Sequence, residues 1–257
     1  MSRFTIIRIT ILLGILTAVG VTSAHQREYT RNWNQPLSAV VYPINADGNS
    51  STDTFIANLN DRHFSSINKW GKREATRYDL DLPNPFNVTL GEQLHTLPPA
   101  WPENQNAITV LLWGLRFRWW AYQNTPDRYD DITQVRLFVI YHEATEHKVL
   151  AHSLGMQKGL MGLVHVFAHR RNNAQNNIVI AHELLHTVGA KDKYRPDGQP
   201  IYPEGYVNSE RKPLHPQRYA ELMAGRIPLT SNDYKMADTL KSVQINSHTA
   251  KEINWIQ

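Results

Sequence analysis

The chain of 257 residues contains no cysteine. Disulfide bonds and thiolate metal ligands are therefore excluded, and stability must come from packing, hydrogen bonds and any bound metal. The chain also has little net charge, because 27 basic residues are balanced by 23 acidic ones. Without Arg3 and Arg8, which lie in an N-terminal segment free of acidic residues, the net charge is only +2. A charge this small gives no indication of nucleic-acid binding.

Residues 1–24 have the features of an export signal. Arg3 and Arg8 give a positive start, residues 9–21 form an apolar core, and small residues ending at Ala24 offer a cleavage site. The core is shorter than the roughly 20 residues of a membrane-spanning helix. An uncleaved membrane anchor stays open, because only Arg8 interrupts the apolar stretch when earlier residues are counted. We expect an exported protein, periplasmic or secreted.

The strongest chemical signal is the H-E-x-x-H run of His182, Glu183 and His186. On a helix, residues four apart lie on one face, about 6 Å apart along the axis. The two histidines could close on one zinc ion, with Glu183 placed to take a proton from a water on that ion. Gly189 could end the helix in a left-handed conformation, which makes Asp192 a candidate third ligand. The alternative is that an ordinary helix matches the pattern by chance.

The extended pattern H-E-x-x-H-x-x-G-x-x-D, from His182 to Asp192, resembles the motif of the zincin metallopeptidases. It is most similar to the metzincin group, in the snapalysin-type branch with aspartate as the third ligand. Glu221 to Gly225 looks like the Met-turn beneath the zinc in that group, with Met223 as its methionine. The usual tyrosine two residues later is absent, because Gly225 stands there. Met223 could equally be an ordinary core residue.

The resemblance implies an α/β (α+β) zincin-like fold. A twisted mixed sheet would pack on helices, one helix would carry the motif, and a small irregular C-terminal subdomain would follow. Composition and length favour a single domain over residues 25–257. We expect its upper subdomain at about residues 36–190 and its lower subdomain at about residues 191–257. Without cysteine, the cysteine-switch latency of some metzincins is excluded.

The same resemblance implies a zinc-dependent endopeptidase with Glu183 as the catalytic base. Tyr194 is a candidate for transition-state stabilisation or for a structural role. In a thermolysin-like alternative, the third zinc ligand is a later glutamate, for which Glu221 is the candidate. A second alternative is a catalytically silent zincin that acts as an envelope or extracellular binding protein. A third is an envelope-surface binding module that uses the aromatic and basic residues at 113–122.

Hydrophobic patterns and turn signals predict the secondary structure around the motif. Strands are expected at residues 37–43, 87–90, 135–141 and 163–169. Helices are expected at about residues 53–78, 217–224, 231–240 and 249–255, with Asn176 or Asn177 capping the motif helix. Alternation of apolar residues from Trp113 to Trp119 predicts a further strand with one buried face, with a helix starting at Ala107 as the alternative.

The resemblance to zincins further implies that the strand at 163–169 borders the cleft and offers a free edge, on which a peptide substrate binds in an extended conformation. The glycine-rich residues 155–162 would form a bulge, a flexible cleft rim or a plain hairpin. His142, His147 and His152 form either a second metal site or a set of scattered loop histidines.

Overall fold

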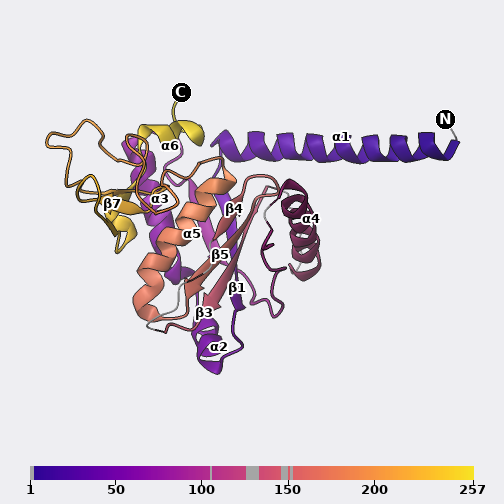
Figure 1. Ribbon diagram of the computed structural model, residues 1–257, viewed down its shortest axis with the longest axis horizontal. Helices are drawn as coiled ribbons and strands as arrows, with labels where there is room; N and C mark the ends of the chain where they lie inside the picture. The colour runs from indigo at the N-terminus through magenta and orange to yellow at the C-terminus, as the bar shows by residue number, and fades with distance from the viewer. Residues whose placement is uncertain (1–2, 105, 126–132, 146–149, 151–152) are drawn as a thin grey trace.

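The computed structural model describes residues 3–104, 106–125, 133–145, 150 and 153–257. A five-stranded sheet in the order β2-β1-β3-β5-β4 lies at the centre (Figure 1). Its parallel strands are β1 Leu37–Asn45, β2 Phe86–Leu90, β3 Val135–His142 and β5 Met161–Phe167. The short edge strand β4 Leu154–Met156 pairs antiparallel with β5. The four strands expected from the sequence are present, and the glycine-rich segment forms a hairpin. The structure confirms a mixed sheet packed on helices.

Helices cover both faces of the sheet. Helices α3 Ser65–Arg77 and α5 Asn173–Thr187 pack on one face, and α4 Ala107–Asn124 covers the other. Along β3, Leu137 and Val139 belong to the core beneath α3 and α5, whereas Phe138 and Ile140 pack with α4. Because successive strand residues point to opposite faces, a sheet covered on both sides requires the continuous apolar run that β3 carries.

Two expectations about the helices are wrong. The segment expected as one helix at 53–78 is broken into α2 Ser50–Ala57, the 3-10 turn η1 Asp61–His63 and α3. Asn60 ends the continuity, because its side chain accepts a hydrogen bond from the Arg62 backbone as the cap of η1. The segment from Trp113 to Trp119 is not a strand but part of α4, which confirms the alternative of a helix that starts at Ala107. The Asn106 side chain caps this helix by accepting from Ile108 and Thr109.

The C-terminal part contains two small sheets instead of the helices expected at 217–224 and 231–240. Strands β6 Ala220–Glu221 and β9 Val243–Gln244 pair in parallel, and β7 Arg226–Pro228 pairs with β8 Tyr234–Met236. The turn η3 Leu240–Ser242 precedes β9, and α6 Ser247–Glu252 provides the expected helix near the C-terminus. These short strands form because partners distant in the chain, such as Gln244 for Leu222, bond their backbones.

The N-terminal segment is a helix, α1 Arg3–Arg31, that projects from the body (Figure 1). Its last residue, Arg31, donates to the Glu252 carbonyl on α6 at 2.5 Å, and Trp33, just after the helix, donates from its indole to the Ile253 carbonyl at 2.7 Å. Among the residues that the structure describes, no helix combines the length and apolarity of a candidate membrane span. The expected cleavage after Ala24 would fall within α1.

Candidate metal centre

Helix α5 carries the H-E-x-x-H motif and is preceded by the 3-10 turn η2 Arg170–Asn172. Asn176 and Asn177, expected as caps, instead lie inside the helix and are buried. The Asn176 amide donates to the Phe167 carbonyl on β5 at 2.9 Å, and the Asn177 amide donates to the Ser66 hydroxyl on α3 at 2.7 Å. Both side chains therefore fix the helix against the elements on which it packs.

The end of α5 turns the chain back towards the motif at Gly189. This glycine has a positive φ of 107°, and its N–H donates to the His186 carbonyl at 3.1 Å. The N–H of Ala190 donates to the Leu185 carbonyl at 3.1 Å. These two bonds form a Schellman motif, which requires a left-handed residue at this position. The expected helix end at Gly189 is confirmed.

The loop after Gly189 is anchored on both sides of Asp192. The Lys191 N–H donates to the Glu252 carboxylate at 3.0 Å, and the buried Lys193 ammonium lies 2.7 Å from the same oxygen. The Lys193 N–H donates to the Met223 carbonyl at 3.0 Å. The residues on both sides of Asp192 are thus fixed in place. The aspartate side chain is short, so its loop must hold it close to the two histidines.

The structure brings His182, His186 and Asp192 together as a group that could hold a metal ion. The Asp192 Oδ1 atom lies 3.0 Å from His182 Nε2 and 3.2 Å from His186 Nε2, and the two Nε2 atoms are 3.1 Å apart. Tetrahedral zinc, with bonds of about 2.0–2.1 Å, would separate its ligand atoms by about 3.3 Å. The three side chains therefore fit a zinc-sized ion closely.

Backbone carbonyls orient both imidazole rings. His182 Nδ1 donates to the Leu222 carbonyl at 3.0 Å, and His186 Nδ1 donates to the Ala190 carbonyl at 2.8 Å. Since a carbonyl only accepts, each Nδ1 must carry the proton, and the neutral ring then offers its Nε2 lone pair to a metal. This arrangement is the usual outer shell of a metal-binding histidine, and sequence spacing alone did not reveal it.

The electrostatics of the group favour a cation. Burial opposes a charge on His182, but hydrogen bonding to Asp192 and the nearby Glu183 raise its pKa to about 9. Burial would also raise the pKa of Asp192, yet its hydrogen bonds to the two imidazoles hold that pKa well below its usual range. A metal ion would replace the proton that this anionic pocket otherwise attracts.

Glu183 lies close enough to His182 and His186 for their charges to act on its carboxyl group. The residue is only 4% exposed, and burial raises the pKa of its carboxyl group. Its Oε2 atom is buried without a hydrogen-bond partner among the residues that the structure describes. The two imidazoles act in the opposite direction to burial and lower the pKa of the Glu183 carboxyl group, which shows that this group lies close to both histidines.

The segment expected as a Met-turn lies directly beneath His182. Its Leu222 carbonyl accepts from that histidine, Met223 is fully buried, and the chain reverses at Gly225 with a φ of 69°. Glu221 does not join the metal group. Its carboxylate instead accepts from the Thr249 hydroxyl at 2.6 Å and from the Ala224 N–H at 3.1 Å.

Tyr194 lies at the rim of the site, with its ring centroid 6.2 Å from that of His182. Burial, followed by the negative charges of Asp192 and Glu183, raises the pKa of Tyr194 to about 12. The phenol is therefore protonated near neutral pH and could donate a hydrogen bond within the site.

The strand that borders the site is β4, not the one expected from the sequence. β5 is bonded on both sides, by β3 and β4, so the sheet edge belongs to β4. Gly155 on β4 packs so closely that an added Cβ would lie 2.5 Å from both the Glu183 carbonyl oxygen and the His186 Cβ. The glycine at this position lets the edge strand approach the motif helix.

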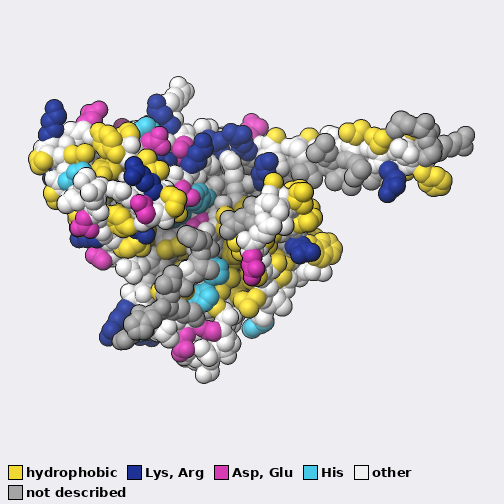
Figure 2. Space-filling model, in the orientation of Figure 1, with side chains coloured by type: hydrophobic (Ala, Val, Ile, Leu, Met, Phe, Trp, Pro, Cys, Tyr) yellow, Lys and Arg dark blue, Asp and Glu magenta, His cyan; other side chains and the backbone are white. Residues whose placement is uncertain are grey.

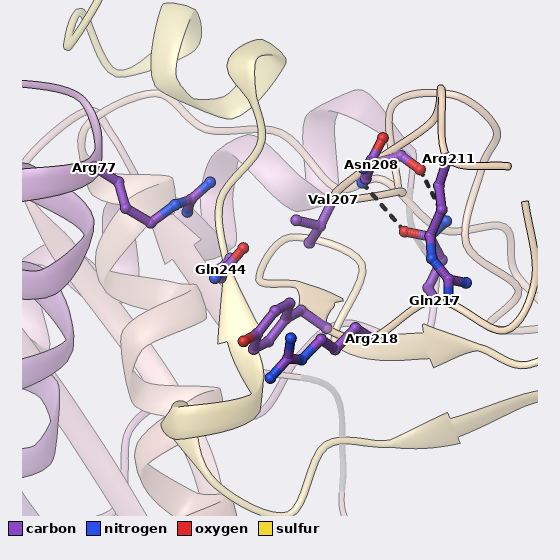
Figure 3. A pocket seen from close by; sticks show the side chains of 8 residues that line it. Arg77, Val207, Asn208, Arg211, Gln217, Arg218 and Gln244 are labelled. Carbon is purple, nitrogen blue, oxygen red and sulfur yellow. Dashed lines mark hydrogen bonds between the residues drawn. The ribbon is translucent and has the colours of Figure 1, made fainter.

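Two of the cavities that the described residues form lie away from the metal group, one in the C-terminal part and one against the sheet. One, of about 330 Å³, is polar and lined in part by Arg77, Arg218 and Gln217 (Figure 3). There Gln217 donates to the Asn208 carbonyl at 2.8 Å and accepts from its N–H at 3.2 Å, which closes the loop between them.

The other cavity, of about 670 Å³, is mainly apolar and lies on the α4 face of the sheet. It contains His142 and His165, whose Nε2 and Nδ1 atoms are 2.9 Å apart. This pair, which joins β3 and β5, was not predicted from the sequence. His147 and His152, for which the sequence leaves open a second metal site with His142 or a set of scattered loop histidines, lie outside the described residues.

The sequence matches no protein-family model, and no curated protein matches it significantly. The geometry of the site therefore carries the functional argument.

Proposed function

We propose that the protein is a zinc-dependent endopeptidase of the zincin type, with His182, His186 and Asp192 as its zinc ligands. One observation carries the proposal: three ligand atoms converge near the buried carboxyl group of Glu183, whose Oε2 oxygen has no hydrogen-bond partner among the described residues. A structural metal site has no need of that oxygen, whereas hydrolysis requires a base next to the metal. Two imidazoles and a carboxylate form a donor set that suits zinc.

When bound, zinc would supply the Lewis acidity that activates a water and polarises the scissile carbonyl group. Glu183 would accept the proton of the attacking water and pass it to the leaving amine. Its raised pKa suits both steps, because a carboxyl group whose pKa lies closer to the working pH both accepts and releases a proton readily. The Tyr194 phenol would donate to the developing negative charge of the carbonyl oxygen.

The substrate in this proposal is a protein or peptide bound along the edge of β4. A sheet edge presents unpaired backbone groups, on which an extended peptide can add one strand. Gly155 brings this edge against Glu183 and His186, so a peptide bond of the added strand would lie near the proposed base.

Replacement of Glu183 by Gln tests the proposal. Gln keeps the size of the side chain but accepts no proton, so hydrolysis of an unfolded protein should fall by about 10² or more. The bound zinc, measured by mass spectrometry of the metal, should stay at one ion per chain. Glu92→Gln, at an exposed glutamate away from the site, is the matched control and should keep full activity.

Zinc-replete Glu183→Gln protein with full activity would overturn the assignment of the base. A wild-type protein that binds zinc but hydrolyses no substrate would favour the catalytically silent binding protein instead.

We also propose that the protein is exported, because residues 1–24 combine basic residues near the start with an apolar core. Mass measurement of the protein purified from its own cells tests this proposal. A mature chain that begins at His25, or a full-length chain recovered outside the cytoplasm, supports export. An intact Met1 in soluble cytoplasm contradicts it.

A further inference from the structure

Helix α4 is apolar on both sides. Its inner side packs Trp113, Phe117 and Ala121 into the core on the sheet face opposite α5. Its outer side carries six large apolar side chains that are between 48% and 69% exposed. We call these residues the α4 outer face: Ile108, Leu111, Leu112, Leu115, Trp119 and Tyr122. A helix on the surface of a soluble protein normally turns polar residues outwards, so this exposed apolar patch indicates a surface that binds a partner.

The charged and polar residues of this helix restrict the kinds of partner that its outer face can bind. α4 contains no aspartate or glutamate, and its two charged residues are Arg116 and Arg118. Arg118 donates to the Lys158 carbonyl at 2.8 Å, while Arg116 is exposed. Trp119 and Tyr122 stack with ring centroids 5.7 Å apart. Aliphatic, aromatic and arginine side chains without acids are the composition that membrane interfaces select.

Helix α1 points to the same partner. It extends from the body on the side on which α4 lies (Figure 1), and its exposed apolar residues include Phe4, Ile7, Leu13 and Val21. Figure 2 shows hydrophobic side chains along this projecting helix and over the region of α4. In the uncleaved chain, a lipid surface that receives α1 would therefore face α4 as well.

We propose that the α4 outer face binds the surface of a phospholipid bilayer. Its leucines, isoleucine and aromatic residues would enter the boundary between headgroups and acyl chains, and Arg116 would contact anionic headgroups. A specific protein interface would be expected to offer more hydrogen-bonding groups than this face, where only Trp119 and Tyr122 carry polar atoms. The inference does not depend on the peptidase proposal, because the metal group lies on the other side of the sheet.

The absence of cysteine allows a direct test with the full chain. Leu115→Cys, labelled with an environment-sensitive fluorophore, reports on α4, and Val21→Cys reports on α1. Lys72→Cys, exposed on α3, is the control on the opposite side of the sheet. Each protein is mixed with phosphatidylcholine vesicles, with and without phosphatidylglycerol, that contain a lipid-bound quencher.

We expect the label at 115 to shift to the blue and to be quenched, more strongly with phosphatidylglycerol, while the label at 72 is unchanged. A response at 21 with none at 115 would overturn the proposal, since α1 alone would then bind lipid. A shift at 115 that depends on protein concentration and not on vesicles would also overturn it, in favour of a second copy of the chain.

Variants without a label give an independent measure. Leu111→Ser with Leu115→Ser should weaken vesicle binding by at least about tenfold, because two apolar side chains that would leave water for the bilayer are lost. Met236→Ser, at an apolar residue of similar exposure on β8, should leave binding unchanged. Equal binding by the double variant and the wild-type protein would contradict the proposal, and unchanged thermal unfolding would show that the double variant is folded.

Discussion

The Nδ1 atom of His182 lies 3.0 Å from the carbonyl oxygen of Leu222, forty residues further along the chain. This bond couples the motif helix to the turn between β6 and β7. With the Leu222 carbonyl directed at the histidine, the neighbouring Glu221 side chain points away, into a pocket formed by Thr249 and the Ala224 N–H. The turn therefore orients one histidine of the proposed zinc site and keeps Glu221 out of that site.

The first prediction separates Asp192 from Glu221 as the third ligand. Asp192→Ala should weaken zinc binding by more than the roughly 10–100-fold typical of an outer-shell carboxylate. Glu221→Gln, which fits the same pocket, should change zinc affinity by less than about tenfold. Competition with a chelator measures both affinities. If Glu221→Gln lost zinc while Asp192→Ala retained it, the thermolysin-like arrangement would replace the one proposed here.

The second prediction concerns the close approach of β4 to the motif helix. Gly155→Ala would place a Cβ 2.5 Å from the Glu183 carbonyl oxygen, so the edge strand must move. We expect a loss of about 1–3 kcal/mol in the free energy of unfolding, as for other overpacked sites, together with reduced peptidase activity. Urea denaturation and the hydrolysis assay measure the two effects.

Gly114→Ala on α4 is the matched control. The added Cβ would meet only the flexible end of Arg118, at 3.2 Å. Alanine is a better helix former than glycine, so this variant should be as stable as the wild type or up to about 1 kcal/mol more stable. Equal stabilities of the Gly155→Ala and wild-type proteins would show that β4 can shift away from α5 without a loss in the free energy of unfolding.

The sequence predicted those features that depend on neighbours in the chain. The spacing of His182 and His186, and the turn at Gly189, follow from the geometry of one helix and its end. Strands β1 and β3 were predicted because a sheet covered on both faces needs long apolar runs. These signals placed two histidines and the catalytic candidate Glu183 on one element.

Features that depend on distant partners were not predicted. In α4 the buried residues Trp113 and Phe117 are four residues apart, as in a helix. Because the outer face is apolar too, this helical period is masked, and the sequence alternates as in a strand. The segment near Leu222 bonds to Gln244 instead of forming a helix. The edge position of β4 likewise depends on which strands pair, which short-range patterns do not encode.

The last prediction concerns the acid stability of the protein. In the apolar cavity on the α4 face of the sheet, burial and then the neighbouring His142 lower the pKa of His165 from 6.5 to about 4. In the unfolded chain this histidine takes up a proton at higher pH than in the folded protein. The folded state therefore has its full stability above about pH 6.5 and loses part of it as the pH falls towards 4.

The shift sets an upper limit of about 3 kcal/mol, and partial exposure of His165 reduces the expected effect to roughly 1–2 kcal/mol. His165→Gln, which keeps hydrogen-bonding groups but does not titrate, should flatten the plot of unfolding free energy against pH between 4 and 6.5. Urea denaturation at a series of pH values measures this slope. His248→Gln, at an exposed position on α6, should leave the slope as it is in the wild type. Superimposable curves for His165→Gln and wild type would show that the partly buried histidine pair does not control acid stability.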